Sequence, residues 1–193
     1  MATTTIRMLK NEREAKSAAD VVSLARAMDW GEGKRPAQKS DRAFFLELIR
    51  ERKKFTREGR KMAAFGAVTK RGQMLGAAAV IPAENEVEWG SEPVAKAALE
   101  LQKKGIDLHD LAYFGSLGVH HRFQRGGIST ALTARCLDFA RKSMGAKIVI
   151  AQTSPDARNS KMVRQFTRDG WVKLDYEGKF QNGMRRHFYY KKL

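Results

Sequence analysis

A strand that runs through a glycine-containing turn into a helix is the predicted feature that most constrains this chain. Residues 117–132 read LGVHHRFQRGGISTAL. Gly126 and Gly127 allow unusual backbone angles, and the next helix begins there with N–H groups that lack an intrahelical acceptor. Such a turn is typical of a pyrophosphate-binding loop, because the helix dipole favours negative charge. The small Ser129 lets phosphates approach the backbone, and Arg125 adds a cation at the rim.

The spacing of apolar residues predicts two helices, a hairpin, a strand, this turn with its helix, a second strand, another helix and a final strand pair. Helices are expected at 12–28, 128–145 and 159–168. A further helix is expected from a cap at Ser40 or Asp41 to about Lys54. The expected strands span 62–69, 74–81, 111–119, 147–152, 171–176 and 187–190. Loops are expected at Gly31–Pro36 and Gln181–Gly183. Residues 83–110 look like an insertion, with a short helix that Pro93 opens and Gly105 closes.

Two glycines, Gly115 and Gly118, interrupt the strand expected at 111–119. Glycine weakens regular strand pairing and often marks a bulge or a close backbone approach. We therefore expect a ligand or another chain segment to lie against this strand.

The composition predicts one soluble globular domain over residues 1–193. Hydrophobic residues make up 42% and charged residues 30% of the chain, which excludes disordered and fibrous classes. No apolar stretch approaches the ~20 residues of a membrane span, and residues 1–10 lack a signal-peptide core, so a cytoplasmic location is expected. A single cysteine, Cys136, excludes an internal disulfide. Four scattered histidines show no zinc-site spacing, and no metal is expected.

The charge balance bears on partners and solubility and says nothing about fold. The chain carries 37 Lys plus Arg and 21 Asp plus Glu, a net charge of +16 spread along its length. Such an excess is typical of proteins that bind polyanions, or of a surface that is simply solvated by many cations. Both interpretations stay open at this point.

Two short patterns stand in register with the predicted elements. The first comprises Gln124, Gly127 and Ser129 in the turn, and the second comprises Asn159, Phe166, Gly170 and Trp171 around the helix at 159–168. Together with the order of elements, over nearly all of the chain, they resemble the GNAT superfamily of acyl-CoA N-acyltransferases. One departure is Ser129, which stands where the family has Gly or Ala, although Ser is also small.

The resemblance implies an α/β (α+β) fold with a mixed, mostly antiparallel central sheet, helices on both faces and a splayed strand pair that holds the cofactor. It implies acetyl-CoA as cosubstrate. The backbone of Leu117–Val119 would pair with the pantetheine arm, splayed from Ile148–Ala151, and Asn159 would hydrogen-bond that arm. The cofactor-binding residues implied are Leu117, Gly118, Val119, Gln124, Arg125, Gly126, Gly127, Ile128, Ser129, Thr130, Asn159 and Phe166.

The usual acid and base of the family are missing from their places. Family members often have Tyr at the position of Phe166 to protonate the CoA thiolate, whereas Phe packs in a core and has no proton to give. Water or one of the chain's four tyrosines remains, namely Tyr113, Tyr176, Tyr189 or Tyr190. The strand before the loop carries no carboxylate, so Ser116 is the catalytic candidate, as a residue that positions a water; a solvent-satisfied hydroxyl is the alternative.

Other polar groups have simpler structural interpretations. Glu84, Glu86 and Glu88 follow the second hairpin strand, either as a source of one carboxylate or as an ordinary solvated acidic loop. His120 and His121 titrate near neutrality, but they lie on the turn that leaves the strand, where a non-catalytic histidine is common. Cys136 lies on the apolar stripe of its helix, which indicates a buried thiol rather than a nucleophile.

The sequence therefore predicts an N-acetyltransferase that moves an acetyl group directly from acetyl-CoA to an amine in a ternary complex. The acceptor classes left open are a small molecule, a peptide and an amine linked to RNA or DNA. A homodimer is also open, and no membrane partner is expected. The alternative is a GNAT-like CoA-binding module with little or no activity, which acts as a regulator or binds nucleic acid.

Overall fold

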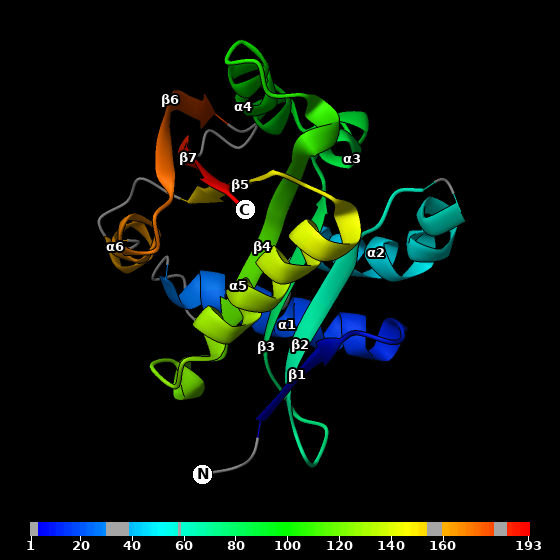
Figure 1. The fold of residues 1–193 in the computed structure, drawn as a ribbon. Coiled ribbons are helices and arrows are strands. Elements are labelled where there is room, and N and C mark those ends of the chain that lie inside the picture. The colour runs from blue at the N-terminus through cyan, green and yellow to red at the C-terminus, as the bar shows by residue number, and fades with distance from the viewer. Residues whose placement is uncertain (1–3, 30–38, 58, 154–159, 180–184) are drawn as a thin grey trace. The chain divides into compact units, whose positions relative to one another are not determined.

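The computed structural model describes residues 4–29, 39–57, 59–153, 160–179 and 185–193 (Figure 1). Its helices are α1 (Glu12–Asp29), α2 (Lys39–Arg57), α3 (Ala83–Glu88), α4 (Glu92–Gln102), α5 (Ile128–Phe139) and α6 (Ser160–Arg168). Its strands are β1 (Thr4–Met8), β2 (Ala63–Thr69), β3 (Met74–Pro82), β4 (Leu111–Val119), β5 (Ile148–Thr153), β6 (Val172–Lys179) and β7 (Arg185–Lys192). Short 3-10 turns span Leu108–Asp110 and His121–Phe123, and a π-helical turn spans Ala140–Met144.

The seven strands form a mixed sheet in the order β1-β2-β3-β4-β5-β7-β6. β4 and β5 pair in parallel. The pairs β1–β2, β2–β3, β5–β7 and β6–β7 are antiparallel. The predicted fold class, a mixed and mostly antiparallel sheet with helices, is confirmed. Within the described ranges, no helix is both long enough and apolar enough to cross a membrane.

The chain divides into two compact units, each described separately below. Unit 1 comprises Met1–Val80 and Ser116–Phe139, and unit 2 comprises Ile81–Gly115 and Ala140–Leu193. The chain passes from unit 2 to unit 1 within β4, between Gly115 and Ser116. The single domain and the insertion at 83–110 stay predictions.

In unit 1, α5 lies over one face of the strands, and α1 and α2 lie behind the other (Figure 1). Phe65 of β2 packs edge-on against Phe139 of α5, with ring centroids 5.8 Å apart. A Cβ atom at Gly118 of β4 would lie 2.6 Å from the Cα atom of Val22 in α1. Since real Cβ contacts are never so short, glycine is required there, and the expected close approach is made by another chain segment, α1.

In unit 2, two neighbouring residues of β7 show that helices lie on both sides of the strands. Side chains alternate between faces along a strand, so Tyr189 and Tyr190 point in opposite directions. The ring of Tyr189 contacts Phe166 of α6, with centroids 5.0 Å apart. The Nζ atom of Lys104, just after α4, lies 6.0 Å from the ring centroid of Tyr190. Helices α6 and α4 therefore lie on opposite faces of β7.

The structure corrects the sequence prediction at three places. The prediction of a solvated acidic loop at Glu84, Glu86 and Glu88 is wrong. Residues 83–88 form α3, because Ala and Glu are good helix formers. Strand β1 was not expected; it is a five-residue strand, mostly half-buried, that shows no clear alternation and pairs along β2. The caps expected at Ser40 or Asp41 are wrong, because both residues lie inside α2. The loops expected at 31–36 and 181–183 lie outside the described residues.

Candidate functional site

The turn before α5 has an unusual backbone. Arg125 has a φ of 73° and Gly127 a φ of 75°, both in the left-handed region. Among the described residues, Arg125 is the one non-glycine residue with positive φ. A left-handed conformation costs a non-glycine residue about 1–3 kcal/mol, and such strain is concentrated at ligand-binding sites. The backbone at Arg125 is therefore a physical mark of a site, independent of the sequence pattern.

The first turn of α5 offers N–H groups to a ligand. The first helical bond runs from the N–H of Ala131 to the carbonyl of Gly127, at 3.0 Å. The N–H groups of Ile128, Ser129 and Thr130 precede that bond and have no acceptor within the helix. A Cβ atom at Gly127 would meet no atom within 4 Å, so the space beside this backbone is open. The predicted loop thus has both the donors and the room that a pyrophosphate needs.

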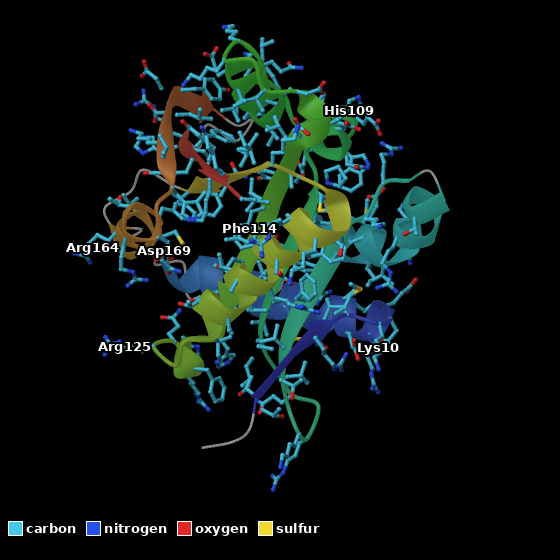
Figure 2. All side chains as sticks on the ribbon, viewed as in Figure 1. Lys10, His109, Phe114, Arg125, Arg164 and Asp169 are labelled. Atoms are coloured by element: carbon cyan, nitrogen blue, oxygen red, sulfur yellow. The ribbon has the colours of Figure 1, made fainter. Side chains whose placement is uncertain are left out.

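Hydrogen bonds anchor this loop to unit 1. The N–H of His120 donates to the carbonyl of Leu75 in β3, at 2.8 Å. The Nε2 atom of Gln124 lies 3.5 Å from the carbonyl oxygen of Val119. Arg125, Gly126 and Gly127 are exposed. Figure 2 shows Arg125 on the loop ahead of α5, with its side chain directed away from the ribbon.

The two histidines have a structural role in this turn. Their rings are stacked, with centroids 4.4 Å apart. The Nδ1 atom of His120 accepts a hydrogen bond from the N–H of Arg122, at 3.3 Å. Burial, with the neighbouring His121 and Arg122, lowers the pKa of His120. The arrangement favours the interpretation of His120 as a turn residue over that of a base.

The parallel register between β4 and β5 ends before either strand does. It runs from Leu111, paired with Ile148, to Phe114, paired with Ala151. β4 continues to Val119 and β5 to Thr153. Residues 117–119, proposed from the resemblance to pair with the pantetheine arm, lie beyond the last register pair. Ser116 is buried on β4, at 6% exposure.

The second sequence pattern falls on α6 and the start of β6. Phe166 is 4% exposed and packs against Trp171, with ring centroids 4.9 Å apart. Gly170 has a φ of 75°, as expected of a residue that ends a helix. Phe166 is thus a core residue, and Tyr189 is the tyrosine in contact with it. Asn159 lies outside the described residues.

One carboxyl group of the acidic segment, that of Glu86, was given no firm role from the sequence. Glu86 of α3 is half-buried, and the loss of solvation raises its pKa to about 7, although a hydrogen bond with Ser91 opposes the shift. A carboxyl that titrates near neutrality has the protonation behaviour of a general base. The sequence signal was the alternation of Glu84, Glu86 and Glu88. On the helix α3 these three side chains are not equally exposed to solvent. Cys136 is fully buried and its pKa is raised by burial, which confirms the predicted buried thiol.

We expect Glu86→Gln to stabilise unit 2 at neutral pH. The pKa is about 7 in the folded chain against an ordinary 4.5, so the folded state holds more protons between these values. The free energy of unfolding therefore falls as pH rises from about 4.5 to about 7. Removing the ionisable group should recover up to about 3 kcal/mol at pH 7. Denaturant titrations at several pH values measure this, with Glu88→Gln on the same helix as control.

An unchanged pH slope in Glu86→Gln contradicts the burial of this carboxyl. The control matters because any Glu→Gln change also alters net charge, and Glu88 is exposed.

Comparisons with known proteins agree with this geometry. The Acetyltransferase (GNAT) family description matches residues 35–170. A search of curated proteins finds no significant match. Solved structures match over the whole fold: an acetyltransferase assigned to the GNAT family from Desulfovibrio desulfuricans has a TM-score of 0.67 and 16% identity, covering 98% of this chain and 99% of its own.

Two further structures bear on ligands. The Salmonella typhimurium protein yncA, solved with its cofactor acetyl-CoA, has a TM-score of 0.64 and 15% identity, covering 100% of this chain and 95% of its own. The ribosomal-protein-S5-alanine acetyltransferase from Vibrio fischeri has a TM-score of 0.64 and 16% identity, covering 100% and 94%. At these identities the structures show the fold alone.

The family match thus places this α/β protein in the class of acyltransferases. The family match spans more than half of the chain, so the chain belongs to the acetyltransferase (GNAT) family. Acetyl-CoA, the expected cosubstrate, agrees with this membership.

Proposed function

We propose that this protein transfers the acetyl group of acetyl-CoA directly to an amine. The observation that carries the proposal is the loop in which Arg125 and Gly127 adopt left-handed angles ahead of the open first turn of α5. The N–H groups of Ile128, Ser129 and Thr130 bind the pyrophosphate, and the helix dipole and Arg125 stabilise its charge. Family membership supports the cosubstrate.

The remaining cofactor contacts follow the sequence prediction. The backbone of Leu117–Val119 pairs with the pantetheine arm, where β4 has left its register with β5. Gln124 and Gly126 shape the loop that receives the phosphates. Asn159 and Phe166 belong to the proposal on the resemblance alone.

In the proposed reaction, the neutral amine attacks the thioester carbonyl carbon within a ternary complex. A backbone N–H near Val119 stabilises the developing oxyanion. The C–S bond breaks, the CoA sulfur leaves as a thiolate that takes up one proton, and the nitrogen loses one proton. No covalent intermediate on the protein is needed.

Two side chains of unit 2 are the best candidates for these proton transfers. Glu86, with its pKa near 7, is the candidate for the group that takes the proton from nitrogen, and Ser116 remains the candidate for a residue that positions a water. Tyr189 is the candidate acid, because its ring contacts Phe166, which stands where the family often has Tyr. Glu86→Gln then lowers kcat by on the order of a hundredfold while it raises stability, a combination that a purely structural carboxyl does not give.

The test of function is turnover of acetyl-CoA with a panel of amines, followed by thiol release. The alternative, a CoA-binding module without activity, is favoured by Phe166 in place of tyrosine. Acetyl-CoA that raises the melting temperature without acetylation of any amine supports that alternative. Absence of both binding and turnover contradicts the proposal outright.

The acceptor we favour is an amine carried by a polyanion, such as an RNA-linked amine. A chain of net charge +16 attracts phosphates and repels free polyamines at long range. A protein amine is the second class, as the name of the Vibrio fischeri neighbour indicates for that enzyme. A cytoplasmic location and assembly as a homodimer complete the proposal.

We expect tRNA to bind at ~50 mM salt and its affinity to fall at least tenfold by ~200 mM. Each neutralised phosphate releases counterions, so binding weakens as salt rises. Filter binding or fluorescence anisotropy measures this, with an uncharged oligonucleotide analogue as control. Affinity that is negligible at ~50 mM, or independent of salt, favours a small-molecule or peptide amine.

A further inference from the structure

Two neighbouring segments of unit 1 carry exposed cations without nearby acids in their own sequence. Lys70 and Arg71 lie in the turn between β2 and β3, and Arg122 lies in the loop before α5; all three are exposed. None of the three forms an ion pair with another described residue. The segments to which they belong, 61–80 and 116–137, contain no Asp or Glu. Their positive charge is therefore available to an anionic partner.

A backbone hydrogen bond holds these two segments together. The N–H of His120 donates to the carbonyl of Leu75, at 2.8 Å. Arg71 precedes Leu75 by four residues, and Arg122 follows His120 by two. The Cα atoms of the two arginines therefore lie within about 26 Å of each other, even if the chain between them is fully extended. Figure 1 shows the turn and the loop near the lower end of the view.

Three partly exposed rings lie in the same loop as Arg122. The rings of His120 and His121 are stacked, with centroids 4.4 Å apart, and the ring of Phe123 lies 5.7 Å from that of His120. All three side chains are half-buried, so each keeps some contact with solvent. Aromatic rings among cations are the combination that binds unpaired nucleotides, because bases stack on rings while cations neutralise phosphates.

We propose that a single-stranded segment of RNA docks on this cationic-aromatic patch of unit 1. The patch comprises Lys70, Arg71, His120, His121, Arg122 and Phe123. This inference rests on the proposed function, because the docked RNA is the carrier of the acceptor amine. An RNA duplex fits less well, since its bases are already stacked on one another. An acidic peptide would use the cations and leave the rings without a partner.

The double variant Lys70→Glu/Arg71→Glu tests the cations. Its affinity for a labelled single-stranded RNA of about 12 nucleotides should fall by about tenfold or more at ~50 mM salt. The slope of log affinity against log salt concentration should become shallower by about 1.4, because each phosphate of a single strand contributes about 0.7. Fluorescence anisotropy measures both quantities. Kd for acetyl-CoA should stay within about twofold, since Arg125 and the N–H groups of α5 hold the pyrophosphate.

The matched control is Arg13→Glu/Lys16→Glu, which changes the net charge by the same amount. Both residues are exposed at the start of α1, which follows the end of β1 that lies away from the turn between β2 and β3. This control should change the RNA affinity by less than about threefold, because charges beyond a Debye length are largely screened. Melting curves show that both double variants are folded.

Phe123→Leu tests the rings, because Leu keeps an apolar side chain and removes the aromatic face. We expect the affinity for the single strand to fall by about fivefold or more while the salt slope stays the same, since stacking releases no counterions. Duplex RNA of the same length should bind the unaltered protein by about fivefold less tightly than the single strand.

Four outcomes overturn the docking. An effect of Lys70→Glu/Arg71→Glu no larger than that of the control shows that net charge alone attracts RNA. A large rise in Kd for acetyl-CoA with unchanged RNA affinity shows that these cations hold the cofactor's phosphates. Duplex RNA that binds as tightly as the single strand shows that the rings stack no bases. An acidic peptide that binds the patch more tightly than RNA, and equally well to Phe123→Leu, makes a protein the partner.

Failure of the proposed function is a separate result. If the single strand binds at the patch and the protein acetylates no amine, acetyl transfer is contradicted and the docking stands. If the protein acetylates a small amine and binds no single-stranded RNA, the docking is contradicted and acetyl transfer stands.

Discussion

Gly127→Asp should weaken acetyl-CoA binding by about a hundredfold or more. At 4 Å, two unit charges near a protein surface interact by about 4 kcal/mol, and a carboxylate at this position would stand beside the pyrophosphate. A hundredfold loss corresponds to about 2.7 kcal/mol. The new side chain also occupies space that is open beside the backbone, since a Cβ atom there meets nothing within 4 Å. Titration calorimetry with acetyl-CoA measures the effect.

Two control variants separate charge from backbone strain. Gly127→Asn has nearly the same shape as the Asp variant, and Asn is tolerated in the left-handed region, so it should keep much more affinity. Gly72, in the turn between β2 and β3, has a φ of 80° and equally open surroundings. Gly72→Asp therefore adds the same strain and the same charge outside the loop, and should change Kd less than twofold. Equal affinity of folded Gly127→Asp and unaltered protein would falsify the loop assignment.

Phe166→Ala should destabilise the folded protein by about 3–5 kcal/mol, the usual cost of truncating a buried Phe. Phe166 is 4% exposed, and its ring contacts both Trp171 and Tyr189. The truncation leaves a cavity that these two rings cannot fill without moving. Urea denaturation gives the free energy of unfolding directly.

Phe166→Tyr is the matched control, because it keeps the ring and adds the hydroxyl of the usual family acid. We expect the turnover rate to change by less than about tenfold, or ~1.4 kcal/mol, if thiolate protonation does not limit the reaction. A much larger gain shows that the missing hydroxyl limits this protein. A negligible loss of stability in Phe166→Ala contradicts the alignment of the second sequence pattern with α6.

The long elements were predictable because a helical apolar period or a long apolar run survives tertiary packing. The helix expected at 12–28 is α1, and the strand expected at 111–119 is β4 with the same bounds. Strand β1 escaped prediction because a short strand with mostly half-buried residues has no contrast between its faces. Helix α3 escaped because its six residues are too few for a period of 3.6 to show.

The parts of the candidate site also differ in how far the sequence alone could predict them. The loop before α5 was predictable, since glycine spacing reports local backbone geometry. The perturbed carboxyl of Glu86 was not, because burial of a carboxyl arises from contacts between residues distant in sequence.

The contact between Gly118 and α1 affects how mutational data on this chain are to be read. Position 118 lies in the strand segment assigned to the cofactor, so loss of activity there would ordinarily be taken as loss of a cofactor contact. Yet any side chain at this position would have to displace Val22 and with it the packing of α1. Inactive variants at position 118 thus carry information about helix packing, and only substitutions that leave α1 in place can report on the cofactor.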